Sequence, residues 1–244
     1  MKNLKTIAEV GSNWNGDISL GKKIIKQVKN SGSDFVKFQM WKTDELISKS
    51  DKNWKYMKKS EFSKSSAKQL KNYSDNLKIG CFWSVFYPEA VNILEDLDVQ
   101  YYKVASWTAA LKHPSALDTL KEIAKTKKPV LISMGFGGNI KKIKNIFKNN
   151  KIYFLYCVAD YPTKVNQIDF KQMQKFDGFS DHTEGYLTSI LYANTLRNSN
   201  QTKFLEKHVC VKESIGPDKP FAMDVSDFAK MMNEIQQISS ISKF

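Results

Sequence analysis

The chain has 244 residues, with 38 lysines and arginines against 25 aspartates and glutamates, which gives a formal net charge of +13. Apolar residues make up 41% of it and aromatic residues 12%. This composition supports a large core and excludes disordered, collagen-like and disulfide-scaffold classes. The lysines are spread along amphipathic stretches and form no dense basic tract. A solvated surface therefore explains the charge better than nucleic-acid binding does.

Cysteine usage and hydropathy indicate the compartment. Cys81, Cys157 and Cys210 are scattered and form no C-x-x-C pair, and no apolar run is long enough to span a membrane. We therefore expect a reduced, cytoplasmic protein with no membrane partner.

Short apolar runs alternate with amphipathic stretches along the whole chain. The amphipathic stretches predict helices; in one of them Leu20, Ile24 and Val28 share a face. The apolar runs are typical of parallel strands covered on both faces. Eight strands are predicted: Lys5–Val10, Asp34–Phe38, Ile79–Trp83, Gln100–Val104, Pro129–Ser133, Ile152–Tyr156, Phe176–Phe179 and Lys203–Glu206.

Eight βα units in a chain of this length predict an α/β fold of the closed (β/α)8 TIM barrel type. The alternative is an open doubly wound sheet, but no glycine-rich phosphate motif follows a predicted strand. We expect a single catalytic domain over residues 1–244.

Polar side chains stand at the carboxyl ends of the predicted strands, where barrels carry their active sites. Lysine and glutamate in apolar strands cost free energy unless they are paired, so any one of them could be a structural ion pair. The same pattern on so many strands favours a site instead. The candidates are Glu9, Lys37, Gln39, Ser84, Lys103, Ser106, Ser133, Asp160, Tyr161, Ser180, Asp181, His182, Glu206 and His208.

Two subsets of these residues indicate chemistry. His182 and His208 end consecutive strands and could reach one divalent cation, although a histidine pair alone is weak evidence for a metal. Lys37 and Lys103, with serines nearby, suit a phosphate or carboxylate ligand. The third histidine, His113, precedes a proline in a loop and receives no role.

Several short segments resemble the motifs of one family, in order and at similar spacing. The segment at residues 7–16, IAEVGSNWNG, is similar to the A-E-[IV]-G-x-N-H-N-G opening of the sialic acid synthase family, the phosphoenolpyruvate-dependent nonulosonate synthases. The others are VKFQ at 36–39, YKVAS at 102–106, YPT at 161–163, SDHT at 180–183, LEKH at 205–208 and GPD at 216–218.

The resemblance implies a barrel enzyme that joins phosphoenolpyruvate to an open-chain N-acylated hexosamine, with release of phosphate and help from Mn²⁺ or Mg²⁺. Alternatives are a related barrel aldolase or lyase and a non-catalytic sugar-acid binding barrel. By position, Glu9 or Glu206 would handle a proton, and His182 and His208 would hold the metal. Phosphoenolpyruvate would contact Lys37, Ser84, Lys103, Ser106 and Ser180, and the acceptor sugar would contact Gln39, Tyr161 and Asp218.

The chain also departs from the family pattern. Trp14 replaces a histidine of the opening motif, Thr108 stands at a common glutamate position, and the sequence at 134–136, MGF, replaces T-G-M. The chain ends at Phe244, soon after the eighth predicted helix, so we expect the family's usual C-terminal antifreeze-like domain to be absent. A separate chain could supply that domain, and the barrel could form a homodimer.

Overall fold

Eight parallel strands close into a barrel in the computed structural model, which describes residues 3–197 and 199–241. Each strand pairs with the next in sequence, and β1 pairs with β8 to close the ring. The predicted TIM barrel is confirmed. Residues 1, 2, 198 and 242–244 of the expected single domain lie outside the described part. The strands are β1 (Leu4–Glu9), β2 (Phe35–Met40), β3 (Gly80–Val85), β4 (Tyr102–Val104), β5 (Val130–Ser133), β6 (Ile152–Tyr156), β7 (Gly178–Asp181) and β8 (Lys203–Cys210).

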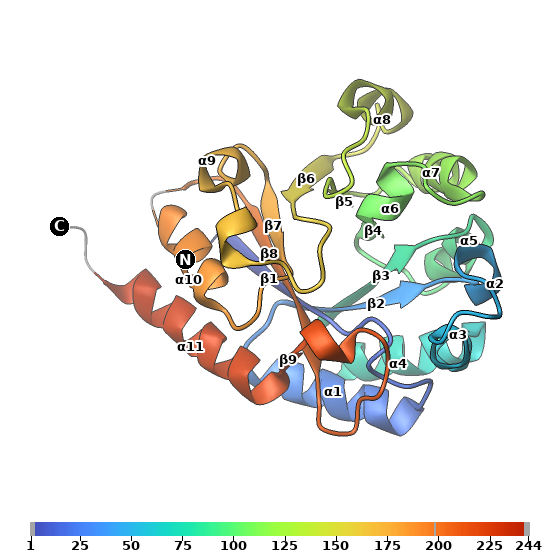
Figure 1. The fold of residues 1–244 in the computed structure, drawn as a ribbon, viewed down its shortest axis with the longest axis horizontal. Coiled ribbons are helices and arrows are strands. Elements are labelled where there is room, and N and C mark those ends of the chain that lie inside the picture. The colour runs from blue at the N-terminus through green and yellow to red at the C-terminus, as the bar shows by residue number, and fades with distance from the viewer. Residues whose placement is uncertain (1–2, 198, 242–244) are drawn as a thin grey trace.

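A helix follows each strand and covers the outside of the barrel (Figure 1). In the first of them, Asp17 accepts hydrogen bonds from the backbone N–H groups of Ser19 and Leu20, which fixes where the helix begins. Its buried face then packs inward. These helices are α1 (Ile18–Asn30), α4 (Lys64–Asn76), α5 (Glu89–Glu95), α7 (Ala116–Lys125), α8 (Ile140–Ile146), α9 (Phe170–Met173), α10 (Leu187–Thr195) and α11 (Val225–Ser240).

Additional short elements lie in the connections beyond the strand ends. They are α2 (Thr43–Leu46), α3 (Trp54–Lys59), α6 (Ser106–Ala109), the 3₁₀ turns at Val165–Gln167 and Lys219–Phe221, and β9 (Met223–Asp224), which pairs with β8. None of the helices in the described ranges is both long and apolar enough to cross a bilayer.

The bounds of β6 match those predicted, and the other seven strands differ by one to four residues at one or both ends, most of all β7 and β8. The seventh strand begins at Gly178 rather than Phe176, because the backbone N–H of Phe176 donates to the carbonyl of Met173 at the end of α9. The eighth strand continues to Cys210, because β1 and β9 hold its later residues. His208 therefore lies inside β8, whereas His182 directly follows β7.

The interior of the barrel is divided into layers. Side chains of Phe35, Phe82, Tyr101, Tyr153 and Phe204 meet ring to ring near the beginnings of the strands, and we call them the aromatic floor. Because alternate residues of a strand share a face, the next inward positions on β2 and β8 are Lys37 and Glu206. The floor thus seals one end of the barrel, and charged groups lie directly above it.

Candidate active site

A pocket of about 480 Å³ opens at the carboxyl ends of the strands. All twelve residues to which the sequence assigned a role line it, so the structure brings the whole predicted set together. They are Glu9, Lys37, Gln39, Ser84, Lys103, Ser106, Tyr161, Ser180, His182, Glu206, His208 and Asp218. The placement is consistent with the roles predicted for them, and the roles themselves stay predictions.

Two buried lysines meet a carboxylate at the bottom of this pocket. The Nζ of Lys103 lies 3.2 Å from Oε1 of Glu206, and the Nζ of Lys37 lies 3.6 Å from Oε2 of Glu206. Lys37 also pairs with Glu9 and donates to the Oγ of Ser84 at 2.7 Å. The lysines come from β2 and β4, so they converge from non-adjacent strands, as the sequence predicted.

Burial sets the ionisation of these groups. It lowers the pKa of Lys37 to about 7, although the neighbouring Glu206 favours the charged ammonium. Burial alone would raise the pKa of Glu206, but Lys103 and Lys37 outweigh it and hold this pKa well below the ordinary value. Ser180 also donates to Glu206, at 2.8 Å. The bottom of the pocket thus holds ionisable groups and hydroxyl donors that can exchange partners with an incoming anion.

The two histidines lie side by side with their ring centres 5.7 Å apart. The Nδ1 of His182 lies 2.8 Å from the carbonyl oxygen of Val158. That oxygen only accepts, so Nδ1 carries the proton and Nε2 keeps its lone pair. Nδ1 of His208 is buried and has no hydrogen-bond partner. Burial lowers the pKa of His182 to about 4 and the pKa of His208 well below its usual range, so it favours the neutral form of both rings.

Neutral imidazoles with available nitrogens are suited to a divalent cation. Within residues 3–197 and 199–241, no group of three or more His, Cys, Asp or Glu side chains is arranged to hold a metal ion. A cation held by this pair of histidines would need water or substrate oxygen to complete its coordination shell.

The loop after β1 donates hydrogen bonds to two carboxylates, Asp218 from the connection after β8 and Glu9 at the end of β1. Asp218 accepts hydrogen bonds from the backbone N–H and the hydroxyl of Ser12, at 2.6 and 2.7 Å. Burial raises the pKa of Asp218 despite these bonds. Glu9 accepts from the backbone N–H of Gly11 at 2.7 Å and from Gln39 at 3.3 Å. Gly11 has a φ of +53°, and a Cβ there would lie 2.3 Å from Asp218, so glycine permits this close approach.

Other lining residues were not identified from the sequence as site residues. We call the following set the outer wall: Asn53, Met57, Phe86, Trp107, Phe136, Pro217 and Phe221. They come from the connections beyond β2, β3, β4, β5 and β8. Connections have no strand periodicity that would indicate which side chains face the pocket. The one signal in the sequence for these residues was that each lies between a predicted strand and the next predicted helix. The rest of the lining is formed by Ala105, Cys157 and Ser133, of which Ser133 was a candidate from the sequence.

Two departures from the family pattern are placed by the structure. Trp14 is buried and stacks on Phe62 at 4.3 Å, so it belongs to the core rather than to the pocket. Thr108 is buried and its hydroxyl lies 3.0 Å from Nε2 of His113. Thr108 therefore contacts His113, and neither side chain lines the pocket.

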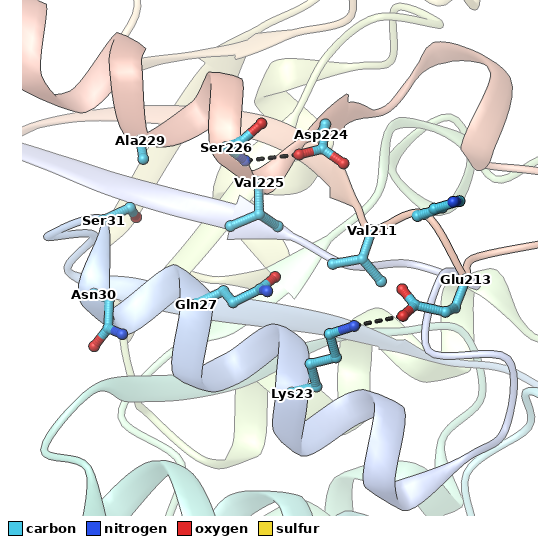
Figure 2. A pocket seen from close by; sticks show the side chains of 11 residues that line it. Lys23, Gln27, Asn30, Ser31, Val211, Glu213, Asp224, Val225, Ser226 and Ala229 are labelled. Atoms are coloured by element: carbon cyan, nitrogen blue, oxygen red, sulfur yellow. Dashed lines mark hydrogen bonds and ion pairs between the residues drawn. The ribbon is translucent and has the colours of Figure 1, made fainter.

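A second hollow, of about 510 Å³, lies between α1, the connection after β8 and the start of α11 (Figure 2). In Figure 2, Lys23 of α1 and Glu213 point toward one another, and their Nζ and Oε1 atoms are 2.5 Å apart. Both side chains are about half exposed, and Asp224 is used to cap α11. None of the residues with a predicted role lines this hollow.

A closed (β/α)8 barrel with lysines, carboxylates and neutral histidines at its strand ends defines an enzyme that acts on small anionic substrates. The chain belongs to the NeuB family, whose profile matches residues 24–243. This confirms the resemblance drawn from the motifs.

Individual relatives agree with that assignment. The chain is 30% identical over 267 residues to an N,N'-diacetyllegionaminic acid synthase of Campylobacter jejuni, covering 98% of this chain and 77% of that protein. It is 31% identical over 260 residues to a pseudaminic acid synthase of Helicobacter pylori, covering 96% and 74%. The crystal structure of a sialic acid synthetase from Leptospira borgpetersenii, in complex with citrate, matches with a TM-score of 0.85 at 24% identity, covering 98% and 86%. The structural match supports the fold.

Proposed function

We propose that this chain condenses phosphoenolpyruvate with the open-chain form of an N-acylated hexosamine, giving a nonulosonic acid and phosphate. C3 of phosphoenolpyruvate bonds to the aldehyde carbon, a water oxygen bonds to C2, and the bond from C2 to the phosphate oxygen breaks. One proton of the water ends on the former aldehyde oxygen, and the other leaves with the phosphate.

The observation that carries this proposal is the convergence of Lys37 and Lys103 on Glu206. Two buried ammonium groups with serine hydroxyls around them provide the donors that a phosphate and a carboxylate require. Ser84, Ser106 and Ser180 line the same pocket. Phosphoenolpyruvate carries both anionic groups on three carbons, so one small pocket can hold it.

His182 and His208 would hold the divalent cation, Mn²⁺ or Mg²⁺, through their neutral nitrogens. When bound there, the cation would polarise the aldehyde oxygen as a Lewis acid. The residues of the chain then orient the two substrates and handle the protons. Glu9 and Glu206 are the carboxylates at the bottom of the pocket. The Oε2 atom of each forms an ion pair with Lys37 and accepts no other hydrogen bond. Either could accept the proton of the attacking water.

The substrates of the relatives support the acceptor class. A product named N,N'-diacetyllegionaminic acid contains two N-acetyl groups, and phosphoenolpyruvate contains no nitrogen. Both amide groups must therefore come from the acceptor. For this chain, an acylated amino sugar is the acceptor consistent with the family.

Phosphate release from phosphoenolpyruvate tests the proposal. We expect release that depends on an N-acylated hexosamine and on Mn²⁺ or Mg²⁺. Lys103→Ala should raise the apparent KM for phosphoenolpyruvate more than tenfold, whereas Lys112→Ala, at an exposed lysine, should leave it unchanged. Absence of release with every N-acylated hexosamine would contradict the synthase. Cleavage of a 2-keto acid without phosphate release would support the lyase alternative.

A further inference from the structure

One buried side chain lies behind the wall of the pocket without lining it. His113, in the connection between α6 and α7, is 7% exposed, and its Nε2 atom lies 3.0 Å from the hydroxyl oxygen of Thr108 in α6. Its ring centre lies 6.0 Å from that of Phe86. Phe86 lines the pocket, and so do Ser106 and Trp107, which precede Thr108 in α6. His113 therefore contacts two parts of the wall from outside the pocket.

The helix α6 has too few residues to hold its orientation by itself. It spans four residues, Ser106–Ala109, and its N-cap residue is Ala105, whose methyl group cannot cap a helix. A helix of one turn is unstable in isolation, because few hydrogen bonds offset the cost of its nucleation. The chain leaves α6 through Leu111, a non-glycine residue with a φ of +57°. Contacts from outside the helix must therefore hold Ser106 and Trp107 in place.

The hydrogen bond between Thr108 and His113 supplies such a contact. The Thr108 side chain is fully buried, so its hydroxyl needs a hydrogen-bond partner. Nδ1 of His113 is buried and has no partner among the described residues. A buried nitrogen is left unpaired more readily as an acceptor than as an N–H donor, so the proton lies on Nε2, which donates to Thr108. Burial also lowers the pKa of His113, although Glu45 opposes this shift, and the neutral ring is favoured.

The segment that contains His113 is tied to the neighbouring connections. The hydroxyl of Ser115 donates to Glu45 of α2, which belongs to the connection after β2. The Nζ of Lys42 pairs with Glu45 at 3.4 Å and with Glu89, the first residue of α5, at 3.0 Å. The connections after β2, β3 and β4 are thus linked to one another beside His113. These links hold its segment in place, so His113 can serve as a fixed point for α6.

We infer that His113 is a positioning residue of the active site, which directs Ser106 and Trp107 into the pocket by holding Thr108. His113 does not contact substrate and acts through α6. This inference rests on the proposed function, in which the hydroxyl of Ser106 is one of the donors to phosphoenolpyruvate. It gives the third histidine of the chain a role that its place in the sequence does not indicate.

Substitutions at both ends of the hydrogen bond test this inference in the full chain. Thr108→Val removes the hydroxyl at nearly constant volume, and His113→Leu removes the ring nitrogens. Each should raise the KM for phosphoenolpyruvate by about fivefold or more and change kcat little, because Ser106 binds substrate and transition state alike. Thr108→Ser and His113→Gln, which keep a hydroxyl and an N–H donor, should retain the wild-type KM. The double variant Thr108→Val with His113→Leu should be no worse than either single variant, because both remove the same bond.

A matched control removes a buried hydroxyl far from the pocket. The hydroxyl of Thr6, near the beginning of β1, donates to Asp34 at 3.1 Å. Thr6→Val should lower the melting temperature and leave the KM for phosphoenolpyruvate unchanged, which separates loss of stability from loss of positioning. Thr108→Val, the milder change at the proposed bond, decides the question if His113→Leu does not fold.

The outcomes distinguish this inference from the proposed reaction. An unchanged KM in folded Thr108→Val would overturn the role of His113 and leave the synthase proposal standing. Calorimetric titration of phosphoenolpyruvate into the same variants measures affinity without turnover. Weaker binding by Thr108→Val than by the wild type, in a chain that releases no phosphate with any sugar, would support the role of His113 and overturn the reaction. A wild-type chain that does not bind phosphoenolpyruvate would overturn both.

Discussion

At the scale of single residues, burial decides the protonation state of Lys37, and with it the pH range of catalysis. The pKa of Lys37 is lowered to about 7, so its positive charge is lost as the pH rises above neutrality. When the Lys37 ammonium loses its charge, an anionic substrate loses one of its binding partners. We expect kcat/KM for phosphoenolpyruvate to fall above about pH 7, since this parameter reports the free enzyme.

Lys37→Arg tests the origin of that fall, because an arginine stays charged throughout the range. The variant should be slower at pH 7 but should show a flatter profile up to pH 9. If kcat/KM of the variant fell above pH 7 as it does in the wild type, the titrating group would not be Lys37. In the wild type, the unfolded chain binds more protons than the native chain between about pH 7 and 10.5, so the contribution of Lys37 to stability rises with pH over this range.

The histidines allow an internal comparison, because the chain has three of them. His182→Ala and His208→Ala should each weaken Mn²⁺ binding at least tenfold, since each removes half of the nitrogen ligands that the chain offers. His113→Gln should leave the affinity unchanged, because His113 does not line the pocket. Calorimetric titration of Mn²⁺ into folded variants measures this. Unchanged Mn²⁺ affinity in both alanine variants would show that the two histidines do not bind the metal.

At the scale of elements, an ion pair between the outward faces of β7 and β8 fixes how the two strands align, and so where their inward side chains lie. Asp181 and Lys207 are register partners on the two strands, and their side chains pair at 3.2 Å with almost no exposure. Asp181 also accepts from the hydroxyls of Thr183, Thr188 and Ser189. The neighbouring inward residues belong to the pocket, so this buried pair positions site residues without contacting substrate.

Asp181→Asn should destabilise the chain by about 3–5 kcal/mol, because it leaves the Lys207 ammonium buried without its carboxylate. The double variant Asp181→Asn with Lys207→Met should recover much of that loss, since an apolar side chain needs no partner. Urea denaturation measures both. Mn²⁺ affinity should follow the same order, and a double variant no more stable than the single one would contradict the role of the pair.

Much of the barrel was predictable because apolar runs and strand ends are local features. The twelve predicted site residues include both ends of the Lys103–Glu206 pair, which is separated by 103 positions, because both side chains interrupt apolar runs. The length of β8 was not predictable. In the sequence, the polar Lys207 indicates the end of the strand. In the structure, Lys207 is buried inside the strand because its ammonium pairs with Asp181. Asn53 and Met57 were missed because α3 lies in a connection whose path depends on tertiary packing.

At the scale of the whole molecule, the barrel separates stability from chemistry along its axis. The aromatic floor lies at the beginnings of the strands and the pocket at their ends. On β8 the inward positions change from aromatic to polar, from Phe204 to Glu206 and His208, and on β2 they change from Phe35 to Lys37. The floor therefore forms the lower boundary of the charged layer.

Phe204→Ala tests whether the aromatic floor and the charged layer above it are independent. Phe204 is 1% exposed and its ring lies 4.8 Å from that of Tyr153, so truncation leaves a cavity and should cost about 3–5 kcal/mol of stability. Below its melting temperature, the variant should retain kcat/KM within a few-fold. Phe136→Ala at the outer wall should do the opposite, with near wild-type stability and weaker acceptor binding. Thermal unfolding and phosphate release, measured on both variants, check this. A large loss of kcat/KM in folded Phe204→Ala would show that the aromatic floor also sets the geometry of the charged layer.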